Sequence, residues 1–412
     1  MDQLVAKRLG KIIKEERINQ NISIRALAEY CSISHTRLAE IENGDKLPSE
    51  EICKNICREL DVEYNFYSQI KDKEDIKHKF DVFFDFVYFQ DLDKADRFYQ
   101  DLLLLEDTKS FVLFEIDFEL IKLIYYISRN KNNKSIKDTM NLLDKNQQLF
   151  FPDETVLYYL YKAAYFTDIN LLVEAENLLM KAIDLTDNIK YLSLIYAQLG
   201  MVHTKNNKTA LAIKYYIDAK IIFDNYMNYV RSLYACSNIA IAYLYSEAYI
   251  EAIKACKECI NIAQRLSLKK VIMINAYNLS YIYMLTGEYE KVNEYVLISL
   301  KNGEPENGIY FHNAYAYYKM KEFALCNYWI EEGRSKLLKS EIFMSYLYDY
   351  LESQTKQCYD QSLEILKKII DSDNYDESFD NQDRRFILKE FLDICKITKR
   401  FDLMAEYYYE LY

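Results

Sequence analysis

The chain has 412 residues, half of them hydrophobic, and a formal net charge of −12. This length exceeds that of one ordinary compact core, so we expect more than one domain. Because only 3 Pro and 7 Gly are present, the composition favours an all-α fold with short connections. No apolar run approaches the roughly 20 residues that cross a bilayer, and the first residues lack a signal-peptide pattern. We therefore expect a cytoplasmic protein with no membrane partner.

The first predicted element is an amphipathic helix over about Gln3–Asn19. Its apolar positions recur at helical spacing and are Val5, Leu9, Ile12 and Ile13. The basic residues expected toward its polar side are Lys7, Arg8, Lys11 and Lys14. We therefore expect one face of this helix to be buried and its basic side to remain accessible.

Three shorter helices are predicted next. A second helix is expected over Ser23–Tyr30 and a third from Ser34 to about Glu42, because a serine hydroxyl at each start can accept from the first backbone N–H groups. Asn43-Gly44 ends the third helix, since glycine adopts a positive φ without strain. Pro48-Ser49 then starts a fourth helix.

This order of helices resembles the Cro/C1-repressor type of helix-turn-helix domain over residues 4–66. The motifs that carry the resemblance are Ala-Leu-Ala-Glu at 26–29, Ile-Ser at 33–34, Ile-Glu-Asn-Gly at 41–44, and Pro48. In such domains the third helix enters the major groove of DNA and its first residues meet base edges. The resemblance therefore assigns DNA binding to Arg25, Ser34, His35, Thr36, Arg37 and Asn43. The alternative is a small helical module for protein–protein contact.

Net charge also bears on DNA binding. Residues 1–48 contain 8 Lys/Arg and 7 Asp/Glu, so this segment carries +1 and the remainder of the chain carries −13. A nearly neutral domain can bind DNA when its cations share one face, but it binds weakly as a single copy. We therefore expect a homodimer that contacts double-stranded operator DNA through two copies of the domain.

The sequence divides into residues 1–66, a polar linker helix over 67–80, and a repetitive region over 81–412. A column of small residues recurs at spacings of 37, 40, 40 and 34, at Ala163, Gly200, Ala240, Ser280 and Ala314. Twelve residues after each lie Ala175, Ala212, Ala252, Val292 and Cys326, and nineteen after each lie Ala182, Ala219, Cys259, Ser299 and Gly333. Small residues in register let paired helices approach closely, so the columns predict about five stacked helical hairpins.

These hairpins resemble the tetratricopeptide repeat between Thr155 and Leu338, and further degenerate hairpins are expected on both sides. The resemblance implies a right-handed superhelical solenoid whose concave face is built from the first helix of each hairpin. An amide in that face can hold a peptide backbone, because it offers both a donor and an acceptor. The positions matching this slot, with tyrosines and cations around them, are Gln198, Lys205, Arg231, Tyr234, Asn238, Tyr245, Tyr277, Asn278, Tyr281, His312 and Tyr315. The alternative is that these side chains tie neighbouring hairpins together.

A Cro-type domain followed by such repeats resembles the peptide-pheromone regulators of the RRNPP group, including its Rgg-like and PlcR-like members. The resemblance implies an imported short signalling peptide bound in the concave face, dimerisation through the repeats, and a peptide-dependent change in DNA binding. The alternative is a DNA-binding repeat protein controlled by a protein partner, either an anti-repressor or a Rap-like contact with a phosphorelay component.

The remaining chemical signals are few, and we expect neither an enzyme nor a cofactor. The 4 His are dispersed, and no phosphate-binding loop or nucleophile elbow is found. The one C-x-x-C, at Cys256 and Cys259, lacks a second pair to complete a metal site. Both cysteines fall at small positions of the repeat, which favours a role in the core over metal or redox chemistry.

Overall fold

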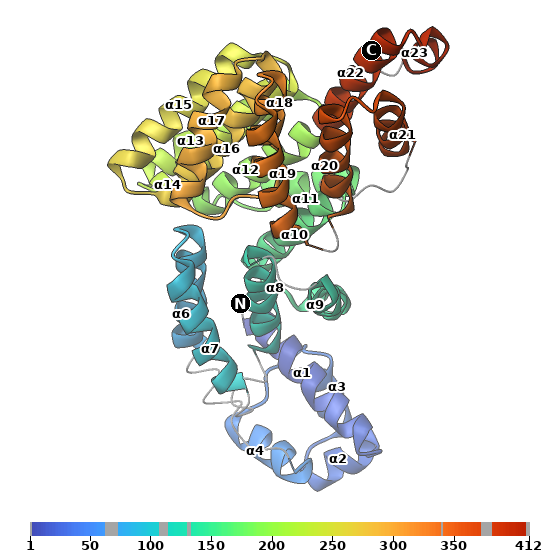
Figure 1. Ribbon diagram of the computed structural model, residues 1–412. Helices are drawn as coiled ribbons and strands as arrows, with labels where there is room; N and C mark the ends of the chain where they lie inside the picture. Colours follow the sequence, from blue (N-terminus) through green and yellow to red (C-terminus); the bar gives the residue numbers. More distant parts are fainter. Residues whose placement is uncertain are drawn as a thin grey trace. The chain divides into compact units, whose positions relative to one another are not determined.

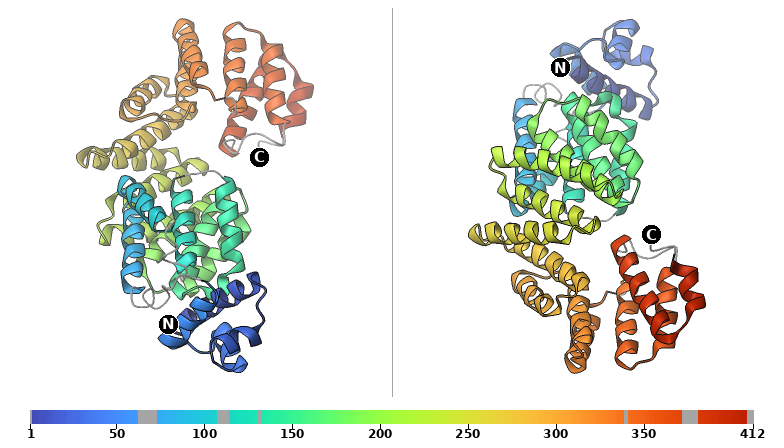
Figure 2. Two further views of the ribbon diagram at one scale, coloured as in Figure 1. Left: turned by 90° about the horizontal axis from the view of Figure 1, so that it is seen from below. Right: turned by 90° about the horizontal axis from the view of Figure 1, so that it is seen from above.

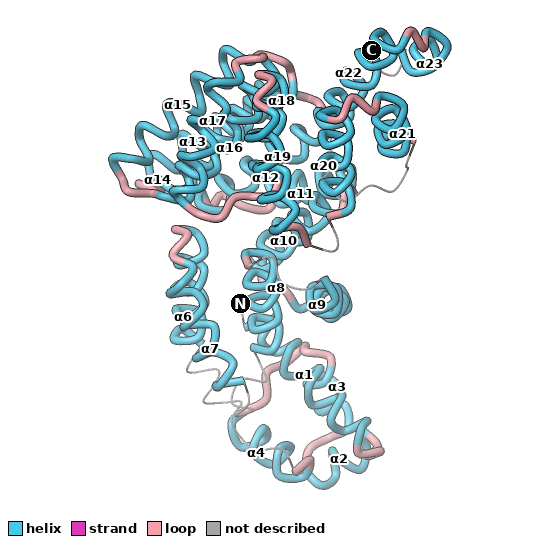
Figure 3. The backbone as a smooth tube through the Cα atoms, in the orientation of Figure 1, coloured by secondary structure: helices cyan, strands magenta, loops and turns pink. Residues whose placement is uncertain are grey.

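The computed structural model describes residues 2–61, 73–106, 114–129, 133–338, 341–371 and 381–408. Within these segments it contains 22 α-helices, a short 3-10 helix and no strand (Figure 3). The prediction of an all-α fold is therefore confirmed. The chain divides into two compact units, Met1–Val202 and His203–Tyr412. In the described portion of the chain, every helix is too short or too polar to span a membrane.

The first four helices gather into one small bundle (Figure 1). They are α1 (Asp2–Asn19), α2 (Ile24–Tyr30), α3 (His35–Glu42) and α4 (Glu50–Glu59). The hydroxyls of Ser23, Ser34 and Ser49 accept from the third backbone N–H beyond each cap, as the sequence predicts. The buried side chains at the centre include Leu9, Ile13, Leu27, Leu38 and Ile41.

Helix α3 is held tightly against α1. Gly10 lies at their closest approach, where a Cβ atom would come 2.2 Å from the carbonyl oxygen of Ile41. Arg17 Nε donates to Glu42 Oε1 at 2.6 Å, and this hydrogen bond raises the pKa of the Arg17 guanidinium. A glycine contact and a buried ion pair thus position α3 within the bundle.

The rest of the first unit consists of helical hairpins. They are α6 (Lys73–Tyr88) with α7 (Leu92–Glu106), α8 (Glu115–Ser128) with α9 (Asn133–Lys145), and α10 (Pro152–Asp168) with α11 (Leu172–Asp184). The short helix η2 (Gln147–Leu149) precedes α10, and α12 (Ile189–Lys205) runs on into the second unit. Of the predicted linker helix, residues 67–72 lie outside the described residues, and residues 73–80 are the first half of α6.

The second unit continues the series. It contains α13 (Thr209–Asn225), α14 (Tyr229–Tyr245) with α15 (Tyr249–Arg265), α16 (Lys269–Thr286) with α17 (Tyr289–Asn302), α18 (Gly308–Lys319) with α19 (Phe323–Lys336), α20 (Ile342–Thr355) with α21 (Tyr359–Ile370), and α22 (Asn381–Thr398) with α23 (Phe401–Tyr407). The first helices α14, α16, α18 and α20 pack side by side in that order, and Figure 2 shows the succession of hairpins from two further directions.

The small-residue columns explain why these hairpins form. Ala163, Ala240, Ser280 and Ala314 are each at most 1% exposed, so each first helix meets its neighbours through a small side chain. The matching positions of the second helices are also buried, including Ala175, Ala212, Ala252, Val292 and Cys326. The repeat register predicted from the sequence is the register of the structure.

Every turn within these hairpins has the same backbone conformation. The residue seven positions after each small residue has a positive φ, as at Asn170, Asn207, Glu247, Gly287 and Lys321. Only one of the five is glycine, so asparagine, glutamate and lysine adopt the left-handed conformation at the others. This recurrent turn reverses the chain with few glycines, which accounts for their scarcity in the composition.

Candidate functional sites

The first candidate site is the N-terminal end of α3. Its core side is filled by Leu38 and Ile41, whereas His35 and Thr36 are exposed and Arg37 is half-buried. Ser34 uses its hydroxyl to cap the helix, accepting from the backbone N–H of Arg37 at 3.1 Å. The end of the helix therefore presents three consecutive side chains that can donate hydrogen bonds to an external partner.

Arg25 and Asn43 are also exposed. Glu40, an acidic residue on α3, forms ion pairs with two cations. Glu40 Oε2 lies 2.9 Å from Lys46 Nζ and 3.5 Å from Arg37 Nη1. The hydrogen bond from Lys46, with a further contribution from Arg37, lowers the pKa of Glu40. Because two cations flank this carboxylate, it adds little net negative charge to the surface.

Arg8 corrects one expectation from the sequence. Its side chain is only 4% exposed and does not lie on an accessible basic side of α1. Its Nη2 donates to Glu154 Oε2 at 2.6 Å and its Nη1 to Asp117 Oδ2 at 2.8 Å. Its Nε donates to the carbonyl of Leu149 at 3.0 Å, and the guanidinium lies 4.6 Å from the centre of the Phe151 ring.

This cluster joins α1 to the helical hairpins of the first unit. Burial and the neighbouring Asp117 raise the pKa of Glu154 well above its ordinary value, although Arg8 opposes the shift. The partners are more than 100 positions from Arg8 in the sequence, so the spacing of charges along α1 gives no signal for them. The only local hint is Pro152 with Glu154, which marks the start of α10.

The second candidate site lies on the first helices of the second unit. Tyr277, Tyr281 and His312 form one cluster: the His312 ring is 5.0 Å from that of Tyr277 and 5.2 Å from that of Tyr281. His312 Nδ1 is 2.8 Å from Ser280 Oγ. Burial lowers the pKa of His312 to about 3, so this imidazole is neutral near pH 7 and offers hydrogen bonds without charge.

The predicted amides have different environments. Asn278 is half-buried, and among the described residues its Nδ2 atom is buried without a hydrogen-bond acceptor. Asn238 is half-buried on α14. Gln198, in the first unit, donates to Thr167 Oγ1 at 3.0 Å and so ties two hairpins together. The Asn278 Nδ2 atom is thus a covered donor that lacks an acceptor among the described residues, and a ligand reaches it only when its surroundings move.

The flanking residues of the predicted groove differ in exposure. Tyr234, Tyr245 and Arg231 are half-buried and Lys205 is exposed. Burial raises the pKa of Tyr234, so its hydroxyl stays protonated. Tyr315 is 3% exposed, and its hydroxyl donates to Glu390 Oε1 on α22 at 2.6 Å.

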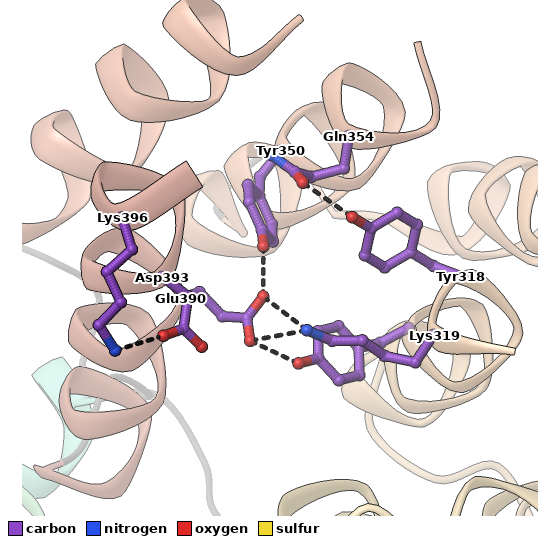
Figure 4. Close-up of polar contacts among 8 residues, drawn as sticks. Tyr318, Lys319, Tyr350, Gln354, Glu390, Asp393 and Lys396 are labelled. Atoms are coloured by element: carbon purple, nitrogen blue, oxygen red, sulfur yellow. Dashed lines mark hydrogen bonds and ion pairs between the residues drawn. The ribbon is translucent and has the colours of Figure 1, made fainter. Parts of the chain in front are cut away.

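The sequence does not predict that α22 lies against these residues. Tyr281 donates to Asp383 Oδ1 at 3.1 Å, and Gln382 Nε2 donates to the carbonyl of Tyr245 at 3.0 Å. Figure 4 shows the Glu390 carboxylate between Tyr350 and Lys319. Glu390 stands among the apolar residues Phe386, Ile387, Leu388, Phe391 and Leu392. This is the signal that could have identified the contact, because such a charge needs partners when the helix is buried.

The two cysteines of the C-x-x-C lie in the core of the repeats. Cys256 and Cys259 are both fully buried, and burial raises the pKa of the Cys256 thiol. In the segments that the structure describes, no group of three His, Cys, Asp or Glu side chains is arranged to hold a metal ion.

Comparison with known proteins supports an organisation into a helix-turn-helix and a repeat region. Residues 13–66 match the helix-turn-helix family. The fold is similar to the apo form of the quorum sensor NprR from B. thuringiensis, with a TM-score of 0.64, 17% identity, and coverage of 82% of this chain and 98% of that one. No curated protein matches the sequence closely enough to count as a relative.

Two further solved structures share the fold. NprR in complex with its cognate peptide NprX gives a TM-score of 0.61 at 18% identity, covering 82% of this chain and 97% of that one. A Rap protein complexed with Competence and Sporulation Factor gives a TM-score of 0.63 at 15% identity, covering 82% of this chain and 97% of that one. The predicted helix-turn-helix domain followed by a helical repeat domain is therefore confirmed.

Proposed function

We infer that this chain, a helix-turn-helix protein whose repeats share the fold of NprR and Rap, is a peptide-responsive DNA-binding regulator of the RRNPP type. The observation that carries the inference is the combination of both regions in a single chain. A helix-turn-helix domain supplies a DNA reader, and one of the matching structures of the repeat fold is a complex with a cognate signalling peptide.

The proposal of DNA binding rests on α3. Its first residues, His35 and Thr36, are exposed, and its core side is fixed by the Gly10 and Arg17 contacts with α1. We propose that α3 enters the major groove, that Arg37 donates to a guanine edge, and that Arg25 and Asn43 contact phosphates. A rigidly positioned α3 suits this role, because base readout needs a fixed register on the duplex.

The proposal of peptide binding rests on the first helices of the second unit. Asn278 has a buried donor without an acceptor among the described residues, and leaving such a donor unpaired costs about 1–3 kcal/mol. A peptide carbonyl placed there would remove that cost. Tyr277, Tyr281 and Tyr234 supply rigid apolar walls with polar tips beside it.

For a peptide to act as a signal, it must bind one conformation of the chain more tightly than another. We propose that the peptide selects one arrangement of the repeats and thereby changes how a dimer presents its two α3 helices to DNA. A peptide that bound both arrangements equally would have no effect on transcription.

A second candidate function is control by a protein partner, and the similarity to a Rap protein favours it over any other alternative. In that case the repeats would bind a phosphorelay component or an anti-repressor. The two candidates differ in what changes DNA binding: a short peptide alone, or a folded protein.

The experiment is a mobility-shift titration of the purified chain on the DNA upstream of its own gene. Short synthetic peptides translated from small neighbouring reading frames are added in turn. A peptide-dependent change in affinity or footprint supports the gated regulator. Specific DNA binding that no peptide alters favours the protein partner, and the absence of specific DNA binding contradicts the assignment of α3.

A further inference from the structure

Helix α22 contacts the first helix of four successive hairpins in the second unit. It reaches the end of α14 through Gln382, which donates to the Tyr245 carbonyl at 3.0 Å, and α16 through Asp383, which accepts from Tyr281 at 3.1 Å. It reaches α18 and α20 through Glu390, which accepts from Tyr315 and Tyr350. Residues that the sequence assigns to a ligand groove are thus already engaged by the chain itself.

Apolar contacts accompany these hydrogen bonds and lie a single helical turn before Glu390. Phe386 is 8% exposed, and its ring meets Tyr315 edge-on at 5.2 Å and Phe311 at 6.1 Å. Because positions four apart lie on the same face of a helix, Phe386 and Glu390 enter the same region of the groove together. The helix therefore inserts an aromatic ring and a carboxylate side by side.

The groove provides matched partners for that carboxylate. Tyr315 and Tyr350 donate to it, and Lys319 Nζ lies 3.1 Å from Glu390 Oε1. Burial, with the Glu390 carboxylate, raises the pKa of both tyrosines well above the ordinary value, so their hydroxyls stay protonated and donate. If α22 left, two buried hydroxyls and an ammonium group would lack their acceptor, and unpaired buried donors are costly.

We propose that α22 occupies the ligand groove as an intramolecular ligand, and that the signalling peptide displaces it with a carboxylate and an aromatic side chain that take the places of Glu390 and Phe386. This inference rests on the proposed peptide-responsive function and specifies its ligand class. The chain then has one state with α22 seated and one with α22 released, and the peptide shifts the balance by binding only the second.

The test uses a fluorescein-labelled synthetic peptide with the sequence of residues 384–392, Arg-Arg-Phe-Ile-Leu-Lys-Glu-Phe-Leu. Binding to the full chain is followed by fluorescence anisotropy. The wild-type chain should bind this probe weakly, because its own α22 competes. The double variant Phe386→Ala, Glu390→Gln should bind it at least about tenfold more tightly, and a probe with Gln in place of the glutamate should lose that gain. Equal binding to both chains overturns the proposal.

An exposed ion pair gives a variant that leaves the buried groove intact. Arg385 Nη1 lies 3.1 Å from Glu247 Oε1, and both side chains are 44% exposed. Arg385→Glu places like charges together and should loosen α22, raising probe affinity about two- to fivefold. Adding Glu247→Arg restores an opposite-charge pair and should return the affinity to the wild-type value. If the single and double charge variants bind the probe alike, α22 does not compete for the groove.

The two proposals can fail separately. Suppose that DNA binding responds to a short peptide and that the response is the same in wild-type and Arg385→Glu chains. The proposal that α22 competes with the peptide is then wrong, and the proposal of a peptide-responsive regulator stands. If the α22 variants gain probe affinity but no short peptide alters DNA binding, the proposal that α22 occupies the groove stands. The proposal that a peptide controls DNA binding is then wrong.

Discussion

In the first unit, Arg8 of α1 forms ion pairs with carboxyl groups on two other helices. Arg8 is shared by two carboxyl groups, those of Asp117 and Glu154, and the Arg8 and Glu154 side chains are both buried. Burial raises the pKa of Glu154 well above its ordinary value, the neighbouring Asp117 adds to this shift, and Arg8 opposes it. Buried ion clusters of this kind are weak sources of stability, but removal of the one cation is severe.

The first prediction concerns the pH dependence of this cluster. In the folded chain Glu154 keeps its proton above pH 4.5, where the unfolded carboxyl has lost it, so its contribution to stability falls as pH rises from 4.5 toward the raised pKa. The free energy of unfolding of the wild type, minus that of Glu154→Gln, should therefore decrease over that range. Urea titrations followed by circular dichroism measure this difference.

Arg8→Met is the matched control for that experiment. It leaves two buried carboxylates without their cation and should cost about 3–5 kcal/mol at neutral pH, far more than Glu154→Gln. A difference between wild type and Glu154→Gln that does not vary with pH would contradict the assigned cause of the pKa shift.

A second prediction concerns DNA readout by a single side chain. Arg37→Ala should weaken binding to the selected operator by about 1–3 kcal/mol, which is the value of one good base contact. The substitution removes only a half-buried surface side chain, so the melting temperature should change little. Anisotropy titrations with labelled operator measure the affinity, and Lys54→Ala, an exposed change on α4, is the control. Unchanged affinity in Arg37→Ala would remove α3 from the interface.

A third prediction separates the half-buried Asn238 and Asn278 of the predicted groove from the fully buried Asn275. The double variant Asn238→Ala, Asn278→Ala should weaken binding of the responding peptide by about 2 kcal/mol, because one hydrogen bond is lost at each site. Stability should hardly change, because the Asn278 Nδ2 atom has no acceptor among the described residues. Asn275→Ala is the contrast, since Asn275 Nδ2 donates to Ser237 and to the Val271 carbonyl. It should lower the melting temperature and spare peptide affinity; the reverse pattern would place the groove elsewhere.

Individual side chains also show the limit of reading the sequence alone. The caps at Ser23 and Ser34 were predictable because a cap and its helix are neighbours in the chain. The environment of Arg8 was not, because its partners lie 109 and 146 positions away. A charge on one helix contains no information about which distant carboxylates will meet it.

At the scale of helices, the hairpins share one packing register and one turn conformation, and only the register was predictable from the sequence. The small-residue columns predicted the register because close packing acts on every hairpin alike. The turn conformation was less visible, since Asn170, Glu247 and Lys321 adopt a positive φ without the glycine that usually marks it. A left-handed conformation costs a residue with a Cβ about 1–2 kcal/mol, so these turns persist because the packing on both sides requires them.

A fourth prediction follows at this scale. Lys321→Gly should stabilise the chain by roughly 0.5–1 kcal/mol, because the relief of backbone strain exceeds the extra entropy of the unfolded glycine. Gly287→Ala should do the opposite by about 1 kcal/mol. A Cβ at Gly287 meets nothing closer than 3.9 Å, so strain at its φ of +80° is the only cost. Thermal melts measure both, and a destabilised Lys321→Gly would contradict this account.

At the scale of the whole molecule, charge argues for two copies. The segment 1–48 has only one more basic than acidic residue, and the structure commits Arg8 and Arg17 to internal ion pairs. Few cations remain to neutralise phosphates, so one helix-turn-helix domain alone should bind DNA weakly. Two domains on a two-fold symmetric site would add their contacts.

The fifth prediction is therefore a homodimer. Sedimentation equilibrium should give twice the 49.2 kDa of one chain. Footprints should show two half-sites separated by about 34–36 Å, one turn of the duplex, or a multiple of it. A chain that sediments as a monomer and protects a single half-site would contradict this arrangement.

The position of α22 in the chain has a consequence for how the protein is made. Its contacts join residues 102 and 138 positions apart. Synthesis proceeds from the N-terminus and domains fold as they emerge, so the hairpins up to α20 can stack while α22 is still inside the ribosome. During that interval the nascent chain exposes its tyrosine-lined groove unoccupied, and a peptide present at that time would meet no competitor.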